Sequence, residues 1–98
     1  MKISLAKPAG KEIRRRVRFH LAAEPGNQVF VAGTFNGWNT SKHPLAPIPN
    51  NGAYGATLFL PTGRHEYKFV VNGQWQVDPQ CPATVPNAYG SLNSVIQV

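Results

Sequence analysis

Two tryptophans, each beside a turn that contains Asn-Gly, are the residues in this chain best placed to bind a ligand. Trp38 follows Asn36-Gly37 directly, and Trp75 follows Asn72-Gly73 after one residue. A tight turn lies at the protein surface, so a tryptophan next to it does not easily become a core residue. The alternative is that both rings fold back over the end of the fold as a small hydrophobic lid. The tryptophans alone do not decide between these two hypotheses.

The second turn predicts a β-hairpin that brings a lysine beside a tryptophan. Asn-Gly between two alternating runs favours a type I′ turn, because both central residues need a positive φ. With Asn72-Gly73 as the loop, Lys68 becomes a diagonal cross-strand neighbour of Trp75, roughly 7–8 Å away at the backbone. These two residues share a predicted ligand face with Val70. The opposite face is predicted to be core and contains Tyr67, Phe69 and Val71.

Flat apolar rings flanked by amides and one cation suit a ligand with apolar faces and polar edges. A sugar has this form, because the C–H face of a pyranose stacks on an indole while its hydroxyls bond Asn, Ser and Lys side chains. Single-stranded nucleic acid also stacks on aromatic rings, so it remains an alternative ligand.

The titratable residues form no recognisable catalytic or metal site. The four acidic residues are scattered along the chain, and no two make a convincing acid–base pair. Glu66 shares the face of Lys68 and could simply pair with it, while Asp78-Pro79 is a turn starter. The three histidines and the lone Cys81 lack the spacing of a metal site. We therefore expect no catalysis, no cofactor and no metal.

Short strands separated by turn signals must position these residues. The strand patterns cover residues 14–21, 29–35, 54–60, 64–71 and 92–98. The proline-rich connections cover residues 39–52 and 78–91. This pattern, without helical periodicity, predicts an all-β antiparallel sandwich or barrel. Because 98 residues suffice for one core, we expect a single domain over residues 13–98 after a flexible lead-in over residues 1–12.

The net charge of +6 comes entirely from the N-terminal part of the chain. Residues 1–18 carry seven of the ten Lys and Arg residues and one of the four acidic residues, and the remainder is balanced. In the predicted first strand the core-facing residues are Val17, Phe19 and Leu21, and they alternate with the outward-facing Arg16, Arg18 and His20. A basic strand can bind nucleic acid or an anionic surface, but a solvated strand face is the simpler explanation.

The sequence also predicts where the protein is found. No apolar run approaches the roughly 18 residues of a membrane helix. The N-terminus lacks the apolar region of a secretory signal, and a single cysteine excludes an intramolecular disulfide. We expect a cytoplasmic protein without membrane contact.

Four segments carry a resemblance to a known family. They are Val29–Trp38 (VFVAGTFNGW), Leu60–Trp75 (LPTGRHEYKFVVNGQW), Asp78-Pro79 and Asn93–Val98 (NSVIQV). In order and spacing they resemble the glycogen-binding domain of the AMP-activated protein kinase β subunit, in carbohydrate-binding module family 48. This family also contains the isoamylase-type N-terminal domains of branching and debranching enzymes. The resemblance implies an early-set immunoglobulin-like β-sandwich that binds α-1,4-glucans such as glycogen or starch.

The resemblance implies roles for individual residues. Trp38 and Trp75 match two tryptophans that stack on sugar. Lys68 and Asn93 match residues that hydrogen-bond glucose hydroxyls.

Three positions depart from the family pattern. Ser91 stands where the family has a threonine, so the hydroxyl is kept. Tyr89 stands where the family has a leucine that reaches through the sugar ring, so contact with sugar is implied but not the same contact. Phe59 replaces a polar residue at an outward position, which marks either a second contact surface or a tolerated apolar side chain.

The expected function is non-catalytic binding of α-1,4-glucans by aromatic stacking and hydrogen bonds, with an α-glucan as the main partner. One alternative is binding of nucleic acid or an anionic surface through the basic strand, which predicts affinity that falls steeply with salt. Another is docking of a protein partner, such as a glycogen-metabolising enzyme or a kinase subunit.

Overall fold

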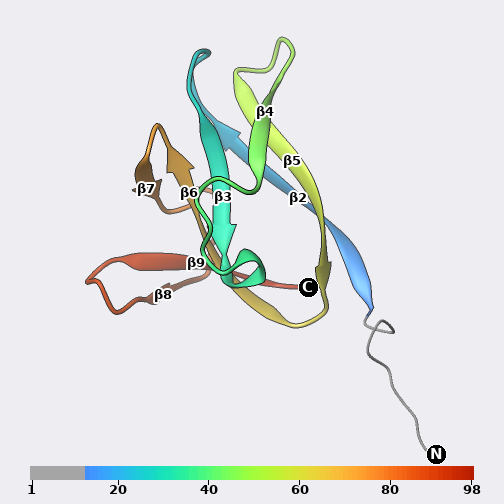
Figure 1. Ribbon diagram of the computed structural model, residues 1–98, viewed down its shortest axis with the longest axis vertical. Coiled ribbons are helices and arrows are strands. Elements are labelled where there is room, and N and C mark those ends of the chain that lie inside the picture. The colour runs from blue at the N-terminus through green and yellow to red at the C-terminus, as the bar shows by residue number, and fades with distance from the viewer. Residues whose placement is uncertain (1–12) are drawn as a thin grey trace, which may run out of the picture.

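The computed structural model describes residues 13–98 as an antiparallel β structure (Figure 1). The predicted lead-in over residues 1–12 lies outside the described residues. The strands are β2 (Arg14–Ala22), β3 (Val29–Gly33), β4 (Pro44–Ile48), β5 (Ala53–Pro61), β6 (Arg64–Val71), β7 (Gln74–Gln76), β8 (Thr84–Pro86) and β9 (Leu92–Gln97). The one helical element among the described residues is a 3-10 turn, η1 (Thr34–Asn36).

The strands form one curled sheet that folds into two layers. Its order is β2-β5-β4-β3-β6-β9-β8, and β7 pairs with β6. Strand β4 links the halves, since it pairs with β5 over three residues and with β3 over two. The layers face each other across the core: Phe19 of β2 and Tyr67 of β6 have ring centroids 5.0 Å apart although their strands do not pair. This arrangement confirms the predicted all-β immunoglobulin-like sandwich.

Alternation along β2 and the register of the hairpin agree with the sequence patterns. The side chains at positions 17, 19 and 21 of β2 are buried in the core, whereas Arg16 and Arg18 are exposed and His20 is half-buried. Val70 pairs with Trp75 across the β6–β7 turn. Asn72 and Gly73 have φ values of 50° and 81°, as the predicted type I′ turn requires.

Two short strands lie where the sequence indicates only proline-rich connections. The predicted long loop over residues 78–91 contains β8, and β4 lies within residues 39–52. Proline is tolerated in both because β8 is at the sheet edge and the ladders of β4 are only two and three residues long. The strand predicted over residues 29–35 ends at Gly33, and η1 begins at the next residue, Thr34.

The connection after β7 is anchored to the core by Tyr67. Its hydroxyl donates a 2.6 Å hydrogen bond to Asp78 Oδ2. Burial, and then this hydrogen bond, raise the pKa of Tyr67 far above its usual value. Asp78 Oδ1 also accepts the backbone N–H of Gln80 at 2.9 Å, which confirms the turn predicted at Asp78-Pro79.

Candidate functional site

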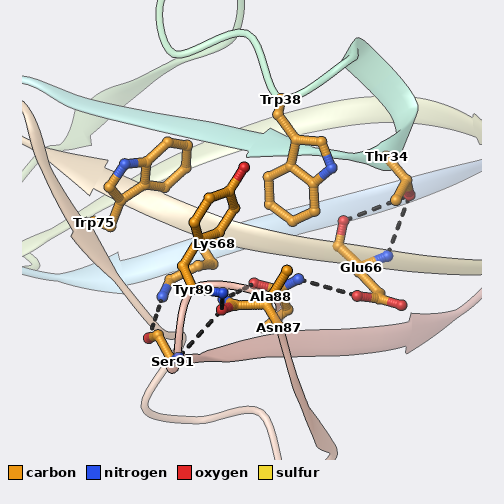
Figure 2. A pocket seen from close by; sticks show the side chains of 10 residues that line it. Thr34, Trp38, Glu66, Lys68, Trp75, Asn87, Ala88, Tyr89 and Ser91 are labelled. Carbon is orange, nitrogen blue, oxygen red and sulfur yellow. Dashed lines mark hydrogen bonds between the residues drawn. The ribbon is translucent and has the colours of Figure 1, made fainter.

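A hollow of about 760 Å³ lies on the outer side of the half sheet that contains β3, β6 and β9. Figure 2 shows the side chains around it, which come from η1 and the turn after it, from β6, from β7, from β9 and from the β8–β9 loop. All six candidate residues from the sequence line this space: Trp38, Lys68, Trp75, Tyr89, Ser91 and Asn93. Four further residues complete the lining: Thr34, Glu66, Asn87 and Ala88.

Three aromatic rings border the hollow. The ring centroids of Trp38 and Trp75 are 6.2 Å apart, and their planes are inclined by 64°. Trp75 is 49% exposed and Tyr89 is 93% exposed, and neither tryptophan belongs to the buried core cluster. The indoles therefore form an open surface around a space, which argues against a lid over the end of the sandwich.

The turn that presents Trp38 is held in a strained conformation by Asn36. Trp38 itself has a φ of 60°, a left-handed value that is costly for a residue other than glycine. The Asn36 side chain stabilises the turn at four points. Its Oδ1 accepts the backbone N–H groups of Gly33 at 3.0 Å and Asn39 at 3.2 Å. Its Nδ2 donates to the carbonyl of Val31 at 3.2 Å and lies 2.8 Å from His43 Nδ1.

The contact with Asn36 defines the protonation state of His43. Because the amide Nδ2 is only a donor, His43 Nδ1 must be the acceptor, and the ring is then neutral. Burial, and then the charge of Lys42, lower the pKa of His43 below its usual value.

Lys68 lies beneath the loop that carries Ser91 and Tyr89. Its side chain is well buried, with 7% of the residue exposed, and Nζ donates a 2.8 Å hydrogen bond to Ser91 Oγ. An ammonium group has three donors, so two remain for a ligand in the hollow. The predicted pairing of Lys68 with Glu66 is wrong, because Glu66 takes other partners.

Glu66 places a carboxylate in the same hollow. Its Oε2 accepts from Arg64 Nη1 at 2.8 Å, and its Oε1 accepts from Asn93 Nδ2 at 3.0 Å. These two hydrogen bonds, the one from Asn93 first, lower the pKa of Glu66 below its usual value. The lining thus contains one cation and one anion, Lys68 and Glu66, which suits a ligand without net charge.

Some lining residues could have been found from the sequence and others could not. Glu66 precedes Lys68 by two residues on one strand, so alternation already placed both on one face. Asn87 and Ala88 lie in a loop without periodicity, and no sequence signal pointed to them.

Residues 13–98 contain no group of three or more His, Cys, Asp or Glu side chains that could hold a metal ion. Within the same range, no helix has the length and apolar character needed to cross a membrane.

Comparison with known proteins identifies the family. A family described as the glycogen recognition site of AMP-activated protein kinase matches residues 16–98. The chain belongs to this family. The match confirms the resemblance to carbohydrate-binding module family 48, and the family description names a recognition site and not a catalytic domain.

Several individual relatives are similar to the chain. It is 47% identical over 73 residues to 5'-AMP-activated protein kinase subunit beta-1 of Sus scrofa, and this match covers 74% of the chain and 56% of the relative. It is 48% identical over 73 residues to the beta-1 subunit of Bos taurus, covering 74% of the chain and 25% of the relative. With the Homo sapiens beta-2 subunit it shares 45% identity over 76 residues, or 78% of the chain and 26% of the relative. The chain therefore spans about half of the first relative and about a quarter of the other two.

Proposed function

We propose that this protein binds α-1,4-glucans of the glycogen and starch type and performs no chemistry on them. The observation that carries the proposal is the pair of inclined indoles, Trp38 and Trp75, at the border of a hollow in a member of a glycogen-recognition family. Pyranose rings expose C–H groups on their faces, and these groups stack on indoles.

The inclination of the indoles favours a curved glucan. Successive glucose units of an α-1,4 chain turn relative to one another, whereas those of a β-1,4 chain lie nearly in one plane. Two rings inclined by 64° can each contact a unit of a curved chain, while a flat chain can lie on only one of them. Tyr89, 93% exposed on the loop beside them, adds a third ring for stacking.

Hydrogen bonds supply the polar part of recognition. The two remaining donors of Lys68 Nζ and the hydroxyl of Ser91 face sugar hydroxyls in this proposal. Asn93 lines the same hollow and is proposed to hydrogen-bond glucose hydroxyls as well. Two or three stacked rings and a few hydrogen bonds correspond to dissociation constants of about 10 μM to 1 mM for short oligosaccharides. Longer and branched glucans bind more tightly through multiple contacts.

The test is isothermal titration calorimetry with β-cyclodextrin, glycogen and, as the flat-chain control, cellohexaose. Wild type is expected to bind the first two and to show no heat with cellohexaose. Trp75→Ala removes a stacking surface and is expected to weaken β-cyclodextrin binding at least about 30-fold. Phe59→Ala is the matched control, because Phe59 is an aromatic residue with 61% exposure on the other half sheet. No binding by wild type, or equal constants for wild type and Trp75→Ala, would overturn the proposal.

The wider roles of the relatives are also proposals for this chain. The relatives are subunits of AMP-activated protein kinase by name, and we propose a kinase or glycogen enzyme as a protein partner on that basis alone. The cytoplasmic location expected from the sequence stays a prediction.

A further inference from the structure

The polar lining of the hollow has a donor end and an acceptor end. The donor end is Lys68, whose ammonium group lies under Ser91 and can only donate. The acceptor end is the carboxylate of Glu66, which comes two residues earlier on β6 and therefore shares the same face of the sheet. Figure 2 shows Lys68 and Ser91 on the side of Trp75, and Glu66 on the side of Trp38. A ligand that fills the hollow thus meets a cation beside one indole and an anion beside the other.

The backbone of Glu66 is fixed at the base of the turn that presents Trp38. Its N–H donates to Thr34 Oγ1 at 3.2 Å. The backbone N–H of Trp38 donates to the carbonyl of Gly33 at 2.9 Å. A Cβ atom at Gly33 would lie 2.5 Å from the carbonyl oxygen of Glu66, so glycine permits this close approach of the two segments. The strand that carries the carboxylate and the turn that carries the indole are therefore held together.

Both oxygens of the Glu66 carboxylate are bonded to protein, and both keep room for another donor. Oε2 accepts from Arg64 Nη1 at 2.8 Å, and Oε1 accepts from Asn93 Nδ2 at 3.0 Å. A carboxylate has about four acceptor positions, so each oxygen keeps one lone pair beside its contact with the described residues. The side chain is 26% exposed and borders the hollow. Because the two hydrogen bonds lower the pKa of Glu66, the carboxylate is ionised near neutral pH and can only accept.

The hydroxyls of a glucan need acceptors as well as donors when they leave water. Each hydroxyl carries one O–H donor, which the ammonium group of Lys68 cannot satisfy. An ionised carboxylate can, and its charge-assisted hydrogen bonds are shorter and roughly twice as strong as those between neutral groups. Each internal unit of an α-1,4 chain carries its 2-OH and 3-OH on neighbouring carbon atoms. Two neighbouring hydroxyls can donate to the two oxygens of one carboxylate, as the parallel N–H groups of an arginine do.

We propose that Glu66 binds the 2-OH and 3-OH of one glucose unit, the unit that stacks on Trp38. Each carboxylate oxygen accepts one of the two hydroxyls. Asn93 contributes beside it, since its Nδ2 keeps a second N–H for the ligand after the bond to Glu66. The inference rests on the proposed glucan binding and adds to it an anionic ligand group and a preference for glucose units in which both of these hydroxyls are free.

The test compares two variants that break the same ion pair. Glu66→Gln keeps the length of the side chain and an oxygen that accepts from Asn93, but it replaces the other acceptor by an NH2 group and removes the charge. Arg64→Gln removes the other partner of the pair and leaves the carboxylate in place, and Arg64 lies outside the residues that line the hollow. In calorimetry with β-cyclodextrin, Glu66→Gln is expected to bind about fivefold more weakly than wild type, and Arg64→Gln within about twofold of it. Equal losses in both variants, or no loss in Glu66→Gln, would overturn the inference and leave the proposed function supported by the binding of wild type.

A crystal structure of wild type with β-cyclodextrin separates a direct contact of Glu66 from an effect through Asn93. Both carboxylate oxygens are expected within about 2.5–3.0 Å of the 2-OH and 3-OH of the glucose unit on Trp38. A carboxylate that contacts only water or protein in the complex contradicts the inference, while sugar stacked on the indoles still supports the proposed function. If wild type binds no β-cyclodextrin, the proposed function fails and the inference fails with it.

Discussion

The two outer faces of the sandwich use similar residues in different geometry. The glucan face, defined by Trp38, Trp75, Tyr89 and Lys68, gathers rings and a cation from separate segments around one hollow. The arginine face, defined by Arg14, Arg16, Arg18 and Phe59, places an exposed ring and cations along two paired strands, β2 and β5. Arg16 pairs directly with Phe59 in the ladder.

The two faces differ more clearly in how their side chains are hydrogen-bonded than in which residue types they contain. On the glucan face, Lys68 and the loop residues are bonded to each other and present further donors to the hollow. On the arginine face, Arg14 Nη1 donates to the carbonyl of Phe59 at 3.1 Å and Arg18 Nη1 donates to Thr57 Oγ1 at 3.2 Å. These guanidinium groups thus lie over their own sheet. In this protein, the rings and the cation border a hollow on the face where separate segments converge.

After the loss of a stacking ring in Trp75→Ala, the largest expected effect tests whether the glucan face depends on its turns. Asn36→Ala removes the four contacts that hold the strained turn of Trp38. We expect β-cyclodextrin affinity to fall about tenfold and stability to fall by about 1–2 kcal/mol. Calorimetric titration and thermal unfolding measure the two effects. Unchanged affinity would show that the turn does not position the indole.

The same turns explain how far the sequence alone could predict this site. Asn-Gly dictates a positive φ at two adjacent positions, which sets the hairpin register and hence the neighbourhood of Lys68 and Trp75. The alternation of apolar and polar residues along β2 and β6 likewise predicted which side chains lie in the core. Such local rules also placed Glu66 beside the site.

The hydrogen bonds that join Glu66, Asn93 and Asn87 could not be predicted because they depend on contacts between distant segments. Glu66 and Asn93 are 27 positions apart, and their contact exists only because β6 and β9 pair. The orientation of the Asn87 amide depends in turn on that contact. The prolines in β4 and β8 also made the sequence of these two strands look like that of loops. The strands form nevertheless, because their ladders are short enough to tolerate proline.

A smaller effect concerns the third ring of the glucan face. Tyr89→Ala is expected to weaken β-cyclodextrin binding about fivefold, because one stacking surface is lost while the loop backbone stays bonded to Asn87. Tyr89→Phe keeps the ring and is expected to bind within about twofold of wild type. Equal losses in both variants would assign the contribution to the hydroxyl and not to stacking.

Acid pH is expected to lower the affinity for glucans through the protonation of His43. The folded pKa of His43 lies below its unfolded value, so neutral His43 stabilises the protein fully above about pH 6.5. This contribution is lost as the pH falls through the folded pKa, because a protonated Nδ1 can no longer accept from Asn36. We expect affinity for β-cyclodextrin to fall about two- to threefold between pH 7.5 and 5.

The control for this pH effect is His43→Gln, which offers a neutral acceptor to Asn36 at every pH. Any pH dependence that remains in this variant comes from other titratable groups. Identical pH profiles for wild type and His43→Gln would exclude His43 as the cause.

The smallest expected effect is the response of glucan binding to salt, and it separates the two faces most directly. A neutral glucan releases no counterions, so its affinity is expected to change less than about twofold between 0.05 and 0.5 M NaCl. Retention on a heparin column instead reports the basic residues, and Arg16→Gln is expected to elute at lower salt than wild type. Trp75→Ala is expected to elute with wild type, since the tryptophan lies on the other face. Earlier elution of Trp75→Ala, or loss of glucan binding in Arg16→Gln, would show that one ligand spans both faces and that the distinction between them is wrong.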